Sequence, residues 1–249
     1  MKLHLALGIT SGEVAAFAGA GGKSSAILTI ADELSEAGMT VVAVPTTKLL
    51  VSEAQRIGPL VTSENADELR TKAREVLSGG ASGIVVGSGL LSKNRVGGVE
   101  PDLISSLVSL ADVVLVEADG ARRRPIKGTA DHEPVLPEVA TLVVAVGNIK
   151  AFGMPVGEEQ VHRPELFSKL TGIGPGQSIT ARAFARALAE GSLSAIPDGA
   201  RPAALITGVL PGKSMADASV VTRELWRRGI EKVVLSSLPD ESPARVWIP

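Results

Sequence analysis

The chain of 249 residues contains no cysteine and only three histidines, which excludes several kinds of site. Without cysteine there is no disulfide framework, no thiolate-held zinc or iron–sulfur centre and no cysteine nucleophile. With only His4, His132 and His162 available, we expect no metal centre built from several histidines. A chain of this length can bury roughly 70–75% of its unfolded surface, so its core needs no such support.

The sequence also lacks a basic excess and has few aromatic residues. It carries 25 lysines and arginines against 27 acidic residues, and only 2% of its residues are aromatic, with no tyrosine. Nucleic-acid binders usually have a basic excess, and single-strand binders add aromatic side chains for stacking. We therefore expect no nucleic-acid partner.

No long apolar segment is present. The apolar run near the N-terminus is soon interrupted by Ser11, Gly12 and Glu13, and no small-residue cleavage site follows it. No uninterrupted apolar run reaches about 18 residues, so we expect no membrane span. These absences predict a cytoplasmic protein.

Short apolar runs alternate with amphipathic runs along the whole chain. We expect strands at Val14–Ala18, Thr40–Val44, Ile84–Val86, Val113–Val116, Thr141–Val146, Ala203–Ile206 and Lys232–Ser236. We expect helices at Ser25–Ala37, Glu64–Leu77, Leu103–Leu110, Pro164–Leu170, Thr180–Ala189 and Ser219–Arg228, and a loose connection at Gly191–Pro202. Strands that are apolar on both faces and separated by helices indicate a mainly parallel sheet covered on both sides. The pattern predicts a three-layer α/β sandwich.

A glycine-rich loop follows the first predicted strand and precedes a helix. It reads Gly19-Ala20-Gly21-Gly22-Lys23-Ser24-Ser25. Glycines let the backbone approach a phosphate closely, and the helix N-terminus adds partial positive charge. In such loops the lysine reaches the β- and γ-phosphates and the following hydroxyl binds Mg²⁺, which assigns those roles to Lys23 and Ser24. The first glycine of the full pattern falls at Phe17, so this is a shortened form; the alternative is a glycine turn with a surface lysine. We expect one P-loop-type domain over residues 1–249.

The dinucleotide-binding fingerprint is a poor fit to the same residues. Its third glycine would stand at Ser24, and the second strand leads into Thr46-Thr47-Lys48 with no ribose-binding acid. Thr46 and Thr47 leave that strand beside the glycine loop, where they could contact a phosphate or the metal, or form a simple turn.

Acidic residues follow the apolar run Val113–Val116 directly. An acid in this position holds Mg²⁺ opposite a phosphate loop, which makes Glu117 the first candidate. Asp119 is an alternative metal-side acid or a base for water. Gly120 lies three residues after Glu117, a spacing that would let its N–H face a terminal phosphate.

Four basic residues follow within a short distance: Arg122, Arg123, Arg124 and Lys127. Such a run is often only a solvated loop, but beside a nucleotide site it can neutralise phosphate charge. We expect Arg124 and Lys127 to stabilise charge in a transition state. The single histidines His132 and His162 are interpreted as structural or exposed.

The sequence contains little that indicates which nucleotide base is recognised. The guanine signature N-K-x-D is absent, and Thr207-Gly208 after a late strand occupies about the position where it would be sought. This favours ATP over GTP, with Mg²⁺ as the companion ion.

Several stretches resemble the YqeC-type family of selenium-dependent hydroxylase accessory proteins. They are VAAFAGAGGKSS at 14–25, Thr46-Thr47-Lys48, EADGARRRPIKGTADHEPVLP at 117–137 and VHRPELF at 161–167. Ser24-Ser25 replaces threonines that are frequent in the family, the Val44–Thr47 run is poorer in threonine, and Gly128-Thr129 replaces a small residue and proline. The resemblance implies a P-loop nucleotide-binding protein that assists maturation of molybdenum hydroxylases or handles a labile selenium cofactor. Its partner would be a molybdenum hydroxylase or a cofactor-maturation protein.

Three functions remain open from the sequence. The first is a Mg²⁺-dependent NTPase. The second is a phosphotransferase or ligase that activates a small acceptor held near residues 122–127 and His132. The third is a nucleotide-gated chaperone with little turnover. A homodimer also stays open, because a phosphate loop without an evident arginine finger can borrow one from a second subunit.

Overall fold

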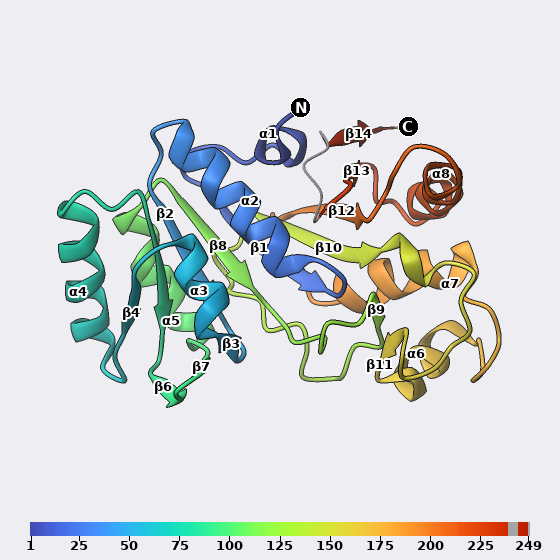
Figure 1. Cartoon of the computed structure of the whole chain (residues 1–249), viewed down its shortest axis with the longest axis horizontal. Coiled ribbons are helices and arrows are strands. Elements are labelled where there is room, and N and C mark those ends of the chain that lie inside the picture. Colours follow the sequence, from blue (N-terminus) through green and yellow to red (C-terminus); the bar gives the residue numbers. More distant parts are fainter. Residues whose placement is uncertain (239–243, 249) are drawn as a thin grey trace.

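A nine-stranded sheet with helices on both faces forms the centre of the molecule (Figure 1). The computed structural model describes residues 1–238 and 244–248. The strand order is β14-β13-β12-β10-β1-β8-β2-β5-β4, and every neighbouring pair is parallel except β13 and β14. The predicted α/β fold with a mainly parallel sheet is confirmed.

The strands of this sheet are β1 (Val14–Gly19), β2 (Val41–Pro45), β4 (Leu60–Thr62), β5 (Gly83–Gly87), β8 (Val113–Glu117), β10 (Leu142–Asn148), β12 (Arg201–Thr207), β13 (Val233–Leu235) and β14 (Arg245–Trp247). Two small sheets lie outside it, one formed by β3 (Leu49–Leu50), β7 (Arg95–Val96) and β6 (Leu90–Ser92), the other by β9 (Ile126–Lys127) and β11 (Val161–His162). The helices are α1 (Leu3–Leu7), α2 (Lys23–Glu36), α3 (Val51–Ile57), α4 (Ala66–Ser78), α5 (Pro101–Leu107), α6 (Pro164–Thr171), α7 (Ala181–Arg186) and α8 (Lys213–Trp226), with short turns η1 (Val108–Leu110), η2 (Ile149–Ala151) and η3 (Ala187–Ser192).

The central strands are buried on both faces, which is why they read as continuous apolar runs. In β1 all six residues are buried. Because side chains alternate along a strand, Val14 and Ala16 belong to one core cluster, and Ala15 and Phe17 belong to the other. The sheet therefore needs a helical layer on each side.

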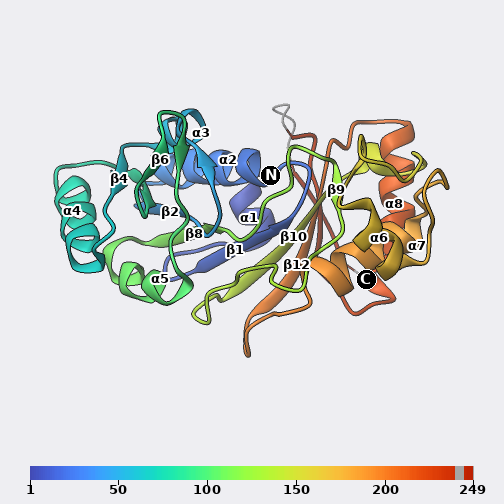
Figure 2. The same ribbon diagram turned by 90° about the horizontal axis from the view of Figure 1, so that it is seen from below.

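The two layers are unequal in size. Helices α1, α2 and α3 cover one face, and α4 to α8 cover the other (Figure 2). Within residues 1–238 and 244–248, every helix is too short or too polar to cross a lipid bilayer.

The register of the sheet brings the informative segments to one edge. Strand β1 lies between β8 and β10, with Phe17 opposite Glu117 and Gly19 opposite Val146. Because these strands are parallel, their carboxyl ends meet, and ligands of open α/β sheets bind at that edge. The loops after β1, β2, β8 and β10 therefore lie together at the carboxyl edge of the sheet.

All seven predicted strands are present, and two helices differ from expectation. Helix α8 begins at Lys213 rather than Ser219; Met215 packs partly buried against the core three residues before Ala218, so the apolar face starts earlier than expected. Helix α7 continues into the wider turn η3, so the predicted loose connection begins only after Ser192. Helices α1 and α3, of 5 and 7 residues, are too short to show a helical period and were not predicted.

Candidate functional site

The glycine loop between β1 and α2 has a backbone that glycine favours. Gly19, Gly21 and Gly22 have φ angles of 101°, 76° and 133°, in the region that other residues rarely adopt. The N–H of Ala20 donates to the carbonyl of Val146 at 2.9 Å. The loop is thereby tied to the neighbouring strand β10.

The loop is packed closely from beneath. A Cβ atom on Gly21 would lie 2.5 Å from the carbonyl oxygen of Pro125 and 2.6 Å from Cβ of Asn148. A Cβ atom on Gly22 would lie 3.0 Å from the side chain of Thr207, whose hydroxyl donates to the carbonyl of Gly21. The ends of β10 and β12 therefore fix the position of the loop relative to the sheet.

The backbone N–H groups of residues 21–25 have no acceptor within the described part of the chain, residues 1–238 and 244–248. The first N–H groups of a helix lack intrahelical partners, and here no side chain caps α2 at Gly22. Gly21, Gly22, Lys23, Ser24 and Ser25 all line one wide cleft. An anion in this cleft would find a row of free donors at a positive helix end.

Substitution of Gly21 by alanine is expected to destabilise the fold more than the same change at Gly176. Both glycines have a φ of 76°, so both variants incur about 1–2 kcal/mol for the left-handed backbone. Only Gly21 is crowded, because Gly176 has nothing within 4 Å of its Cβ position. The extra crowding should cost roughly 1–3 kcal/mol more, measured by urea unfolding. Equal losses in the two variants would contradict the close packing.

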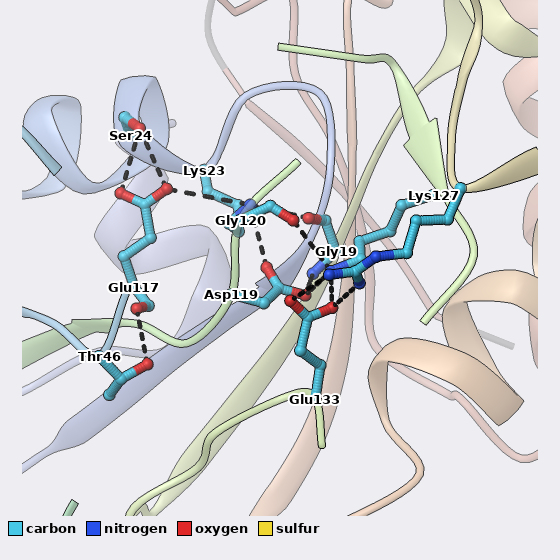
Figure 3. A network of polar contacts seen from close by, with 10 residues as sticks. Gly19, Lys23, Ser24, Thr46, Glu117, Asp119, Gly120, Lys127 and Glu133 are labelled. Atoms are coloured by element: carbon cyan, nitrogen blue, oxygen red, sulfur yellow. Dashed lines mark hydrogen bonds and ion pairs between the residues drawn. The ribbon is translucent and has the colours of Figure 1, made fainter. Parts of the chain in front are cut away.

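Lys23 is the first residue of α2 and its side chain is buried, with 4% exposed. Its Nζ donates to the carbonyl of Gly19 at 2.7 Å and lies 3.0 Å from Oδ1 of Asp119 and 3.9 Å from Glu117. Burial alone would lower the pKa of Lys23, but the charges of Asp119 and Glu117 outweigh it and raise the pKa. Lys23 is therefore a charged ammonium folded back onto its own loop (Figure 3).

Ser24 and Glu117 form the second element of the site. The Ser24 hydroxyl lies 3.1 and 3.2 Å from the two carboxylate oxygens of Glu117. Thr46 holds the backbone of Glu117, because its N–H and hydroxyl both donate to the Glu117 carbonyl, at 3.0 and 3.1 Å. Burial raises the pKa of Glu117, with Lys23 and Ser24 acting against it.

The oxygen atoms of Ser24 and Glu117 fit a magnesium ion. Mg²⁺ prefers oxygen ligands and is usually held by one or two protein groups plus substrate phosphates and water. In the part of the chain that the structure describes, no group of three or more histidine and acidic side chains could hold a metal by itself. The donor set therefore suits an ion that arrives with a phosphate.

Asp119 connects the loop to a row of buried charges. Its side chain is fully buried, and its Oδ2 accepts the N–H of Gly19 at 2.9 Å. Lys127 lies on the other side, and its Nζ donates to Asp119 at 3.0 Å, to the carbonyl of Gly120 at 3.0 Å and to Glu133 at 2.5 Å. An ammonium has three donors, so those of Lys127 are all engaged.

The row ends at a pair that the sequence did not indicate. Arg163 binds both carboxylate oxygens of Glu133, one of them at 3.2 Å. Burial would raise the pKa of Glu133, but hydrogen bonds from Arg163 and Lys127 and their charges lower it to about 2. Residues 132–134 (His-Glu-Pro) and 162–164 (His-Arg-Pro), which are 30 residues apart, thus meet at the site. The similar form of these two segments was the sequence feature that could have indicated their meeting.

Most of the predicted site residues meet in the cleft. It is lined by Gly21, Gly22, Lys23, Ser24, Ser25, Thr46, Thr47, Glu117, Asp119, Gly120 and Arg124. Gly19, Ala20 and Lys127 lie behind this lining, where they hold its groups in place. Thr207, where base recognition was sought, is buried beneath the glycine loop.

Known proteins resemble the chain at different levels. The structure is similar to that of the signal recognition particle receptor FtsY from Elizabethkingia anophelis, with a TM-score of 0.40 and 14% identity. That match covers 89% of this chain but only 57% of the receptor's length. The uncharacterized protein YqeC of Escherichia coli (strain K12) is 27% identical over 230 residues, which are 91% of this chain and 87% of the relative. The model of the YqeC protein family matches residues 15–165, more than half of the sequence, so the chain belongs to the YqeC family.

Proposed function

We propose that the chain binds a Mg²⁺–nucleotide through its phosphates and hydrolyses the terminal phosphate. The row of free N–H groups at residues 21–25 is the observation that carries this proposal. Backbone donors at the start of a helix are what a phosphate group needs, and Lys23 stands in the same cleft.

The charges of the ion-paired residues in the site balance one another. Lys23, Lys127 and Arg163 lie in ion pairs with Glu117, Asp119 and Glu133. A nucleotide brings several negative charges into this neutral arrangement. The Lys23 ammonium can pair with the phosphates by leaving the Gly19 carbonyl. Ser24 and Glu117 would hold Mg²⁺, which neutralises phosphate charge.

The remaining residues divide into two groups in this proposal. Gly120, Thr46, Thr47 and Arg124 line the cleft, and Arg124 supplies positive charge to the transferring phosphate. Asp119 and Lys127 are buried and engaged, so they position the glycine loop. Glu117 remains the acid proposed to hold the metal, because its carboxylate lies beside the Ser24 hydroxyl.

ATP is proposed rather than GTP. The chain has no N-K-x-D sequence, and Thr207 is bonded beneath the glycine loop instead of facing a base. The resemblance of the motif segments to the YqeC-type family supports a role in maturation of molybdenum hydroxylases, with the hydroxylase or a maturation protein as partner.

The proposal is tested by Glu117→Gln, with Glu158→Gln as a control because Glu158 is an exposed acid lining the same cleft. ATP at 100 times its Kd should stabilise the wild-type chain by about 2.7 kcal/mol, and more weakly without Mg²⁺. Glu117→Gln should lose the Mg²⁺ dependence and about 100-fold in turnover, on the scale of losing one electrostatic group. Thermal unfolding with ATP, GTP, ADP and NAD measures binding, and phosphate release from ATP measures turnover. Absence of any nucleotide effect on the wild type would overturn the proposal.

A further inference from the structure

The cleft continues beyond the glycine loop to a second, basic wall. This wall is formed by Arg122 and Arg124, from the segment after β8, and by His162 and Arg163, where β11 leads into α6. Arg163 is separated from Lys23 by the row of ion pairs through Asp119, Lys127 and Glu133. The basic wall and the glycine loop are therefore distinct parts of one cleft.

The backbone of the basic wall and of the neighbouring Arg123 is unusual. Arg122, Arg123 and Arg163 have φ angles of 46°, 60° and 58°. They are the only residues other than glycine with positive φ among residues 1–238 and 244–248, and all three line this cleft. Such conformations cost about 1–3 kcal/mol each and gather at ligand clamps, where surrounding structure maintains them.

The charges of the wall are not fully compensated. Arg163 is paired with Glu133, and Arg123 points toward Glu53, 3.8 Å away. The side chains of Arg122 and Arg124 form no ion pair within residues 1–238 and 244–248. Burial lowers the pKa of His162, and the positive charges of Arg163, Lys127 and Arg122 lower it further, against Glu133. The surroundings of His162 are thus those that an anion would stabilise.

We propose that the basic wall binds the phosphate group of a second, phosphorylated small molecule, so that the cleft holds it together with the nucleotide. Guanidinium groups bind phosphate through paired hydrogen bonds, and a neutral imidazole can donate one more. Glu158 and Glu165 also line the cleft; both are exposed, as is Arg122, whereas Arg124, His162 and Arg163 are half-buried. The inference rests on the proposed function only for the role of the glycine loop.

The test measures binding of inorganic phosphate by titration calorimetry in a Lys23→Ala background, which removes the cation of the glycine loop. Phosphate binding should persist there, and Arg122→Gln or His162→Gln should each weaken it about tenfold or more, as expected for a charge-assisted hydrogen bond. Arg123→Gln is the matched control, because it shares the loop and the positive φ but is directed to Glu53. Citrate serves as a carboxylate probe of similar charge.

Three outcomes would overturn the basic wall as a phosphate site. Phosphate binding could vanish in Lys23→Ala, both wall variants could keep the affinity of their background, or citrate could bind more tightly than phosphate. The proposed function is judged separately: nucleotide binding by the wild type with no phosphate binding in Lys23→Ala removes only this inference. Phosphate binding at the wall without any nucleotide binding removes only the proposed function.

Discussion

Substitution of Lys23 by alanine is expected to abolish the stabilisation that Mg²⁺–ATP gives the folded chain. Lys23 is the cation within the glycine loop itself, and its ammonium must leave Gly19 and Asp119 to contact a phosphate. About 2.7 kcal/mol of ligand stabilisation corresponds to a shift in Tm of roughly 5–10 °C for a chain of this size. In Lys23→Ala that shift should disappear.

Lys48→Ala is the matched control for this experiment. Lys48 lines the same cleft but is exposed, and it lies outside the glycine loop. Its removal should leave the shift in Tm almost unchanged. If Lys23→Ala binds ATP with wild-type affinity, the glycine loop is only a turn and the nucleotide proposal fails.

Substitution of Lys127 by methionine should cost about 3–5 kcal/mol in the free energy of unfolding. The side chain is 1% exposed and its ammonium lies between Asp119 and Glu133, so its removal leaves buried carboxylates short of a partner. Lys150→Met, at an exposed lysine of the same cleft, should change stability by less than about 0.5 kcal/mol. Urea unfolding measures both.

A double variant shows how much of the stability lost in Lys127→Met comes from the missing charge and how much from poorer packing. Adding Glu133→Gln to Lys127→Met removes one of the two carboxylates that lost Lys127 and restores equal numbers of positive and negative charges in the row, so part of the lost stability should return. If Lys127 instead contacts the phosphate directly, as the sequence predicted, Lys127→Met should keep its stability and lose turnover. The two roles therefore give opposite results in the same pair of measurements.

The fold and the core of the site could be predicted because their signals are local. Strands buried on both faces read as apolar runs, and the glycine loop, Lys23, Ser24 and Glu117 are adjacent in sequence to those runs. Parallel pairing then brings Glu117 beside the loop, where its carboxylate meets Ser24. The roles of these residues in binding remain predictions.

The buried row of charges could not be predicted, because its members depend on long-range contacts. Glu133 and Arg163 are 30 residues apart, and apart from the similar form of their two segments nothing in the local sequence indicates that they meet. Lys127 looked like one more cation of a basic loop until the fold surrounded it with acceptors. Thr207 likewise gains its role only because β12 lies two strands from β1 and ends beneath Gly21.

The glycine loop contains two kinds of amide, which hydrogen–deuterium exchange would separate. The N–H groups of Gly19 and Ala20 donate to Asp119 and Val146, both buried, so they should exchange only when the surrounding structure opens. Those of residues 21–25 have no such acceptor in the described chain and should exchange fast, and the phosphate of the proposed nucleotide would slow them. The two protected amides, of Gly19 and Ala20, thus serve as a reference within the loop against which ligand binding at the amides of residues 21–25 can be measured.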